Sequence, residues 1–368
     1  MDNNQYASSS GGELRDSMNK KLVVLVVIFL AIPIAFVSHS LRPMKMLQYN
    51  KNFNNDDMNS DLIVVGFSQL GSESDWRTAN TKSIQSALTE ENGFSLIFSN
   101  GRQKQENQIK DIRSFIFQEV DYIIIAPVME TGWNTVLEEA REAGIPVIIV
   151  DRMIDTQDEK LYVACVGTDK YVEGKKAGLW LEKYLEENES SGNVPGNKGS
   201  TGKEVNIAVL EGTANSTAQL GRSKGFEEIA ARNNNWNILA HESGDFTKAR
   251  GKEVMAQYLR EFDHIDVLVS QNDDMTFGAI EAIQEAGLTC GINGDITVIS
   301  FDAVAEAFDK MEEGLINVDI ECNPLQGPLI AEVIKRLERE EMVDRISYVN
   351  ERVFEAGNAS IDRVGRSY

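Results

Sequence analysis

From residue 61 onward the chain alternates short apolar runs with amphipathic stretches. Several apolar runs are rich in β-branched residues, which is typical of strands that are covered on both faces. This alternation predicts βαβ units and parallel sheets. The predicted strands are Leu62–Phe67, Phe94–Ser99, Tyr122–Ala126, Val147–Val150, Tyr162–Val166, Val205–Leu210, Ile238–His241, Val267–Ser270, Ile296–Phe301 and Ile316–Ile320.

The amphipathic stretches between these runs predict helices. Gln108–Gln118 places Phe115 and three isoleucines on one helical face. Val136–Ala143 ends at Gly144 before an Ile-Pro pair, which is a normal helix stop. About ten strands are too many for one simple doubly wound sheet, so we expect two sheets. Asn188–Lys203 is rich in Gly, Ser and Asn and predicts a surface insertion between a helix and a strand.

The N-terminal region carries an export pattern. Met1–Lys21 is polar and predicts a cytoplasmic leader, and the uncharged apolar run Leu22–Val37 comes directly after it. Basic residues before an apolar run are typical of a signal segment, and they predict that the rest of the chain lies outside the cytoplasm. The segments are then the leader 1–21, a signal or membrane anchor helix 22–40 and a tether 41–60.

Cleavage of this segment stays open at this point. The apolar run is shorter than the ~20 residues of a typical spanning helix. Ser38-His39-Ser40 is a poor cleavage site, and no lipoprotein cysteine comes after the run. The long polar leader favours an uncleaved anchor over a removed signal.

Composition and charge narrow the function classes. Hydrophobic residues make up 42% and charged residues 26%, which is ordinary for a soluble globular protein. The net charge of −22 repels nucleic acid and anionic lipid, so no nucleic-acid partner is expected. Cys165, Cys290 and Cys322 are far apart in sequence and predict buried apolar residues, not a disulfide framework.

Polar side chains gather where the predicted strands end. Ligands of open parallel sheets bind beyond the carboxyl ends of strands. Carboxylates, amides, guanidinium groups and an indole come after six of the predicted strands, which suits a polyhydroxylated ligand. These groups lie in Ser68–Arg77, Asp151-Arg152, Glu211–Thr213 with Arg222 further on, Gln271–Asp274, Asp302 and Glu321–Pro328.

Each of these residues also has a structural interpretation. Asp273 is a candidate helix cap, and Asp151-Arg152 a candidate ion pair without a ligand. Trp76 is a candidate core residue, and Phe246 is a candidate for packing under a helix. Only the joint pattern favours a ligand site.

Enzymatic interpretations find little support. Gly221–Gly225 satisfies the Gly-x-Ser-x-Gly pattern, but that motif needs a strand directly before the serine, and Ala218–Leu220 predicts a helix start. The histidines His39, His241 and His264 are scattered and predict neither a triad nor a zinc site. We therefore expect no catalytic residue, no metal and no cofactor.

The motifs at the strand ends carry a family resemblance. From about Val64 to the mid-340s the sequence resembles the type I periplasmic sugar-binding proteins of the ribose and galactofuranose type, which serve ABC transporters. Its most specific pieces are Val65–Arg77, Arg102–Phe115, Ile124–Trp133, Ile149–Asp155, Ser243–Met255 and Gln271–Met275.

The resemblance implies an α/β fold of two doubly wound parallel-sheet lobes joined by a three-stranded hinge, with the ligand between the lobes. Lobe 1 is then 61–165 plus 327–352, and lobe 2 is 166–326 plus 353–368. The implied crossings lie near Cys165, near Phe301–Asp302 and Asn323–Gln326, and near the C-terminus.

The resemblance also implies roles for individual residues. Glu73, Trp76 and Arg77 match a first-lobe loop that holds the sugar ring. A pair in the same lobe takes two hydroxyls, and further contacts come from the second lobe and the hinge. These positions are Asp151 and Arg152 for the pair, Arg222, Phe246, Asn272 and Asp302 for lobe 2, and Gln326 for the hinge. Asp75 stands where the galactofuranose type has a small residue, which leaves the ligand's identity open.

The implied function is capture of a monosaccharide, a galactofuranose- or galactose-like hexose or a pentose, by a monomer at the outer face of the cytoplasmic membrane. The protein then delivers the sugar to an ABC permease. The alternative is a membrane-tethered sensor that presents the sugar to a histidine kinase or chemoreceptor. A regulator of the lac-repressor type shares the fold but requires an N-terminal helix-turn-helix, where this chain has its apolar run.

Overall fold

A computed structural model describes residues 62–191, 204–364, 366 and 368. The predictions for the leader, the apolar run, the tether and nearly all of the 188–203 insertion therefore lie outside the described residues. Among the residues that are described, no helix is both long enough and apolar enough to cross a membrane.

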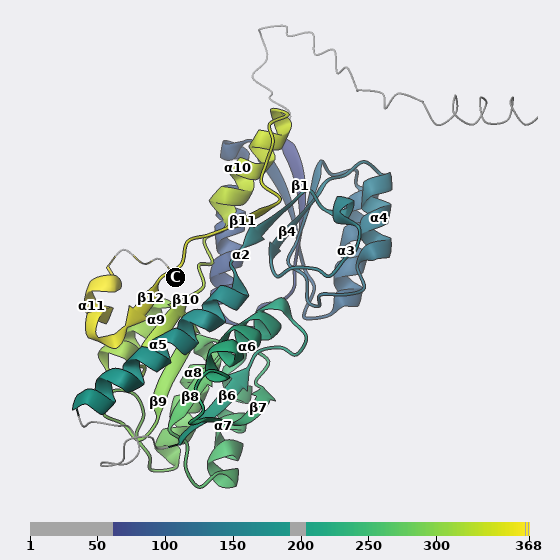
Figure 1. The fold of residues 1–368 in the computed structure, drawn as a ribbon. Coiled ribbons are helices and arrows are strands. Elements are labelled where there is room, and N and C mark those ends of the chain that lie inside the picture. Colours follow the sequence, from purple (N-terminus) through teal and green to yellow (C-terminus); the bar gives the residue numbers. More distant parts are fainter. Residues whose placement is uncertain (1–61, 192–203, 365, 367) are drawn as a thin grey trace, which may run out of the picture. The chain divides into compact units, whose positions relative to one another are not determined.

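The first sheet has six strands in the order β11-β5-β4-β3-β1-β2, all paired in parallel. Helix α10 packs against α2, and α3 packs against α4 (Figure 1). The strands are β1 (Ile63–Gln69), β2 (Phe94–Asn100), β3 (Tyr122–Ile125), β4 (Val147–Asp151), β5 (Ala164–Gly167) and β11 (Ile346–Tyr348). The helices are α2 (Asp75–Ala87), α3 (Gln105–Phe117), α4 (Asn134–Glu142) and α10 (Gly327–Glu338), with short 3-10 turns at Glu90–Asn92 and Glu159–Leu161.

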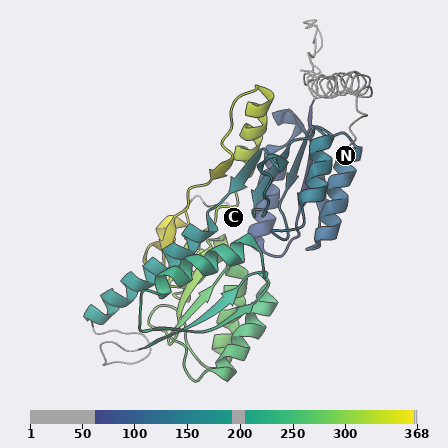
Figure 2. The same ribbon diagram turned by 45° about the vertical axis from the view of Figure 1, so that its right-hand side comes forward.

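The second sheet repeats this order as β12-β10-β9-β8-β6-β7, with only β12 antiparallel to its neighbour. Helices α5 and α6 lie side by side, as Figure 2 shows from a second direction. The strands are β6 (Val205–Glu211), β7 (Trp236–Ser243), β8 (Val267–Ser270), β9 (Thr297–Asp302), β10 (Val318–Glu321) and β12 (Val353–Glu355). The helices are α5 (Lys170–Ser191), α6 (Thr217–Ala230), α7 (Lys248–Glu261), α8 (Asp273–Glu285), α9 (Ala305–Glu312) and α11 (Ala359–Asp362), with a 3-10 turn at Ala356–Asn358.

The buried strands show why the apolar runs predicted this fold. In β3, Ile124 packs into the apolar core on one face of the sheet, while Ile123 and Ile125 pack into the core on the other face. Because successive side chains of a strand point to opposite faces, a strand covered on both faces needs an unbroken apolar run. All ten predicted strands are present, with ends displaced by at most two residues.

The sequence pattern missed β11 and β12. Both strands are three residues long, and their outward-facing residues are exposed. Neither forms an apolar run that separates it from the surrounding loops.

Three connections join the two sheets and form the hinge predicted for this fold. They run between β5 and α5, between β10 and α10, and between β11 and β12. The crossing predicted near Phe301–Asp302 is wrong, because β9 ends there and continues through α9 to β10 in the same sheet.

Candidate functional site

Nine of the ten predicted site residues line one narrow cavity between the two lobes. They come from the loop after β1, the first turn of α2, the ends of β4, β8 and β9, helix α6 and the loop after β7. The parallel strands of each lobe thus direct their carboxyl ends toward the same space, as expected for such sheets. The nine residues are Glu73, Trp76, Arg77, Asp151, Arg152, Arg222, Phe246, Asn272 and Asp302.

The start of α2 places two of these residues. The Ser74 side chain caps the helix by accepting a hydrogen bond from the Arg77 backbone N–H. Trp76 and Arg77 then lie in the first helical turn, and both are buried.

A network of buried charges occupies the lobe 1 side of the cavity. Arg77 Nη2 lies 2.5 Å from Asp151 Oδ2, and Arg77 Nε lies 3.1 Å from Glu73 Oε1. Arg152 Nη2 lies 3.3 Å from the same Glu73 oxygen. Burial favours a raised pKa for Asp151, but the charges of Lys170, Arg77 and Arg152 outweigh it and hold this pKa below its ordinary value. Asp151 is therefore an ionised acceptor.

Arg222 anchors the lobe 2 side. Its Nε lies 2.7 Å from Glu173 Oε2, and its Nη2 lies 3.1 Å from Asp302 Oδ1. Burial lowers the pKa of Arg222, but the charges of Glu173 and Asp302 reverse this and raise it. Burial raises the pKa of Asp302 above its usual range, and the Arg222 guanidinium opposes the rise.

Two aromatic rings complete the walls. The Trp76 indole N–H donates to the Cys322 carbonyl at 2.5 Å, and the Arg77 guanidinium lies 4.7 Å from the Trp76 ring centre. Arg152 lies 5.3 Å from the Phe246 ring centre. Trp76 is therefore buried, as expected for a core residue, and it also lines the cavity, as expected for a ligand-binding residue.

Three of the cavity residues have a left-handed backbone. The φ angles are 64° at Asp151, 58° at Phe246 and 111° at Asp302. Such angles are uncommon for residues other than glycine and carry a cost of about 1–3 kcal/mol each. Strain of this kind concentrates at functional sites, so it supports the assignment independently of side-chain chemistry.

Of the two neighbours that come after β8, Asn272 lines the cavity and Asp273 does not. The Asn272 Oδ1 accepts from the Met275 backbone N–H and caps α8, while its Nδ2 donates to the Phe246 carbonyl. Asp273 turns away from the cavity and accepts from Ser300 Oγ at 2.6 Å and Val304 N at 2.8 Å. Asp273 therefore has a structural role, but the expectation that it caps the helix is wrong, because Asn272 is the N-cap of α8.

Gln326 does not line the cavity. Its Oε1 accepts from Asn80 Nδ2 at 3.2 Å, and its Nε2 donates to the Asn323 carbonyl at 3.2 Å. The amide is fully buried, and both of its polar groups bond to the protein. It holds the hinge connection against α2 and does not contact this cavity.

The sequence pattern missed Lys170, at the start of α5, and Cys322, in the hinge connection between β10 and α10, and both line the cavity. Lys170 Nζ lies 3.1 Å from Asp151 Oδ1 and 3.0 Å from Cys322 Sγ. A signal existed, since Lys170 comes after the predicted strand Tyr162–Val166 just as the other candidates come after theirs. The three cysteines are buried and unpaired, as predicted.

The cavity is narrow because its charged groups contact one another directly. It leaves about 20 Å³, which is room for about one water molecule. A larger ligand requires the lobes and the ion pairs of Arg77, Arg152 and Arg222 to separate, after which these groups contact the ligand instead of each other.

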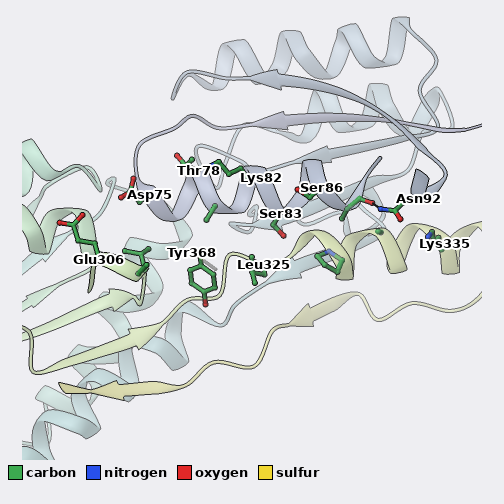
Figure 3. A pocket seen from close by; sticks show the side chains of 16 residues that line it. Asp75, Thr78, Lys82, Ser83, Ser86, Asn92, Glu306, Leu325, Lys335 and Tyr368 are labelled. Carbon is green, nitrogen blue, oxygen red and sulfur yellow. Dashed lines mark hydrogen bonds between the residues drawn. The ribbon is translucent and has the colours of Figure 1, made fainter. Parts of the chain in front are cut away.

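A larger hollow of about 800 Å³ lies away from this cavity (Figure 3). It runs along the outer face of α2, beside α10, the start of α9 and Tyr368, and contains none of the ten predicted residues. Asp75 lines this outer hollow and not the narrow cavity.

Gly221–Gly225 lies inside α6, so the strand required by the nucleophile motif is absent at this place. The Ser223 hydroxyl donates to Glu211 and accepts from Gln271 Nε2. A Cβ at Gly225 would lie 2.1 Å from the Tyr171 carbonyl, so this glycine allows α5 and α6 to approach. The motif is explained by helix packing.

Among the described residues, Glu173, Cys322 and Glu351 form one cluster with metal-ligand chemistry, their ligand atoms lying within 4.8 Å of one another. Glu173 already pairs with Arg222 and Lys170. These two cations compensate the cluster's negative charge, which disfavours a metal ion there.

Comparison with known proteins agrees with the geometry. Residues 65–339 match the family described as periplasmic binding protein domain. The chain is 42% identical to the galactofuranose-binding protein YtfQ of Escherichia coli over 270 residues, which is 72% of this chain and 79% of that protein. It is 31% identical to the fructose import binding protein FruE of Bifidobacterium longum over 83% of this chain and 89% of that protein.

A solved structure gives the same result. The periplasmic binding protein component of the arabinose ABC transporter from Shewanella sp., bound to α- and β-L-arabinofuranose, aligns with a TM-score of 0.74 and 38% identity. The alignment covers 82% of this chain and 94% of that chain. With two matching parallel-sheet lobes and a family match over most of its length, the chain belongs to the periplasmic binding protein domain family.

Proposed function

We propose that this protein captures a monosaccharide in the narrow cavity between its lobes and delivers it to an ABC permease, without chemistry on the sugar. One observation carries the proposal. Carboxylate, amide, guanidinium and indole groups from both lobes line a single cavity. Buried charges without a ligand role are costly, and a polyhydroxylated ligand uses such groups as donors and acceptors.

Individual roles follow from the chemistry of each group. Asp151 and Asp302 accept hydrogen bonds from sugar hydroxyls, one on each lobe. Arg77, Arg152, Arg222 and Lys170 donate to hydroxyl and ring oxygens. Hydrogen bonds that involve charged groups contribute about 1.5–3 kcal/mol each, and closure removes the water that weakens them. Trp76 and Phe246 offer apolar ring faces to the carbon skeleton of the sugar.

The relatives support a hexose or a pentose, with a five-membered ring preferred. One is a galactofuranose-binding protein, and a solved relative holds arabinofuranose. Asp75, where this chain departs from the galactofuranose type, lines the outer hollow and not the cavity. This difference from the galactofuranose type therefore does not alter the wall of the narrow cavity.

The roles of the relatives favour transport over sensing, because they are import binding proteins or an ABC transporter component. We infer that the protein works outside the cytoplasmic membrane as a monomer, held by the apolar run Leu22–Val37. The lobes are inferred to be 61–165 plus 327–352 and 166–326 plus 353–368. N-terminal sequencing of the mature protein distinguishes a retained anchor from a cleaved signal.

Calorimetry with galactose, methyl galactofuranoside, arabinose and ribose tests the proposal. We expect saturable one-to-one binding of at least one sugar, with a change in tryptophan fluorescence because Trp76 lies in the cavity wall. Trp76→Phe keeps a ring but loses the indole donor, and should weaken binding and remove most of the fluorescence change. Trp133→Phe, in the lobe 1 core, is the matched control. A panel of hexoses and pentoses that produces neither heat nor a fluorescence change refutes the proposal.

A further inference from the structure

A second hollow of about 420 Å³ lies directly beside the narrow cavity. It is lined by Glu130 and Met153 from lobe 1, by Lys170 at the start of α5 and Tyr348 at the end of β11, and by Thr217 and Lys224 from α6. Its volume falls in the range of about 300–1,000 Å³ that small-molecule sites occupy.

The two spaces share a wall. Asp151 and Lys170 line both of them, and their side chains form an ion pair of 3.1 Å between Oδ1 and Nζ. Both side chains are at most 4% exposed. A sugar oxygen that bonds to Lys170 or Asp151 in the narrow cavity therefore lies at the boundary of the second hollow. A substituent carried on that oxygen would enter the second hollow where the Asp151–Lys170 pair separates around it.

The second hollow carries chemistry that suits a sugar. Glu130 supplies a carboxylate, Lys224 an ammonium group and Tyr348 an aromatic ring that is 53% exposed. Tyr171 adds a second ring, with Lys224 Nζ 5.8 Å from its centre. Charged donors and acceptors beside exposed aromatic faces match the character of the narrow cavity. The outer hollow along α2 differs in position, because it shares no residue with the narrow cavity.

We propose that this second hollow is a second sugar subsite, so that the protein takes a disaccharide or another glycoside whose first ring lies in the narrow cavity. This rests on the proposed function and extends its substrate class. A second ring here would contact both lobes and the hinge, so it would add contacts that form only when the lobes are closed. Asp151 and Lys170 then bind near the oxygen that links the two rings. Glu130, Lys224 and Tyr348 bind the second ring.

The test compares galactose, methyl β-galactofuranoside and a galactofuranosyl disaccharide by calorimetry on the full chain. We expect the disaccharide to bind at least as tightly as the best monosaccharide. The double variant Lys224→Ala/Tyr348→Ala should weaken disaccharide binding by about tenfold, as expected for about 1.4 kcal/mol, and change monosaccharide binding by less than twofold. Lys183→Ala, which removes an exposed lysine of α5 outside both spaces, is the control.

The outcomes separate the two proposals. If the protein binds a monosaccharide but neither the methyl glycoside nor the disaccharide, the proposal of a second subsite is wrong and the proposed function still stands. Equal effects of the double variant on both ligand classes also overturn the subsite. Absence of binding by every sugar overturns both. Selective loss of disaccharide affinity supports the subsite.

Discussion

The Thr217 hydroxyl bonds both main-chain groups of Met153 across the gap between the lobes. It accepts from the Met153 N–H at 3.0 Å and donates to the Met153 carbonyl at 3.0 Å. Met153 comes after β4 in lobe 1, and Thr217 begins α6 in lobe 2. These two bonds break when the lobes separate, so they stabilise the closed form.

Thr217→Val keeps the shape of the side chain and removes both bonds. We expect sugar affinity to fall about tenfold, since each hydrogen bond contributes about 0.5–1.5 kcal/mol. The loss should come mainly from faster dissociation, which stopped-flow fluorescence measures. Thr131→Val on an exposed lobe 1 turn should leave the dissociation rate unchanged. Equal dissociation rates for Thr217→Val and the unaltered protein would show that these two bonds play no part in closure.

Asp151→Asn preserves size while removing the charge that Arg77 and Lys170 share. Sugar affinity should fall about 100-fold, which corresponds to about 2.8 kcal/mol. The melting temperature should also fall, because two buried cations lose their nearest carboxylate. Asp158→Asn, in an exposed ion pair with Arg141, should change neither quantity appreciably. Calorimetry and thermal melts check both, and unchanged affinity in Asp151→Asn would remove this residue from the site.

Gly212 makes room for Phe246. A Cβ at Gly212 would lie 1.8 Å from the Phe246 ring, so Gly212→Ala must displace the ring from the cavity wall. Overpacking of this kind costs about 1–3 kcal/mol, and the displaced ring should lower sugar affinity as well. A Cβ at Gly357 meets no heavy atom within 4 Å, so Gly357→Ala is the control. A Gly212→Ala protein with normal melting temperature and affinity contradicts this assignment.

We expect Asp274 to make sugar binding sensitive to pH. Its Oδ2 accepts from the Asp75 backbone N–H at 3.1 Å, which joins α8 of lobe 2 to α2 of lobe 1. Burial raises the pKa of Asp274 to about 7, and the nearby charges of Asp75, Glu306 and Glu73 act in the same direction. In the open form this carboxyl regains water, and its pKa falls toward the ordinary value of about 3.9.

The closed form therefore binds one more proton than the open form between these two pKa values. Its stabilisation is fully present at low pH and is lost as the pH rises through about 7. Sugar affinity should thus increase as the pH falls from about 8 to about 5.5. Asp274→Asn should flatten this increase while keeping the acceptor for the Asp75 N–H. Calorimetry at several pH values measures both slopes, and identical slopes in the two proteins exclude Asp274 as the group responsible.

Local pattern in the sequence predicted two parallel sheets with polar groups at their strand ends, while the family resemblance implied the two lobes, the hinge and the roles of the cavity residues. Apolar runs such as Tyr122–Ala126 reveal a doubly covered strand because burial on both faces demands it. Polar residues at the ends of such strands, including Asp151 in the first sheet and Asp302 in the second, lie at the edge of their own sheet where its parallel strands end. These inferences need only neighbours along the chain.

This reasoning did not predict contacts between segments that are far apart in the sequence. The Lys170–Cys322 contact joins the start of α5 to the hinge connection between β10 and α10, and nothing in either stretch indicates the other. Gln326 resembles a site residue in sequence, yet Asn80 and Asn323 take up its amide. The left-handed backbone at Asp302 and the hollow beside Lys170 likewise arise only where both lobes and the hinge meet. The sequence alone determined which elements form and where their polar ends point. Only the tertiary structure decided which of those groups meet, because contact between distant segments depends on how the whole chain packs.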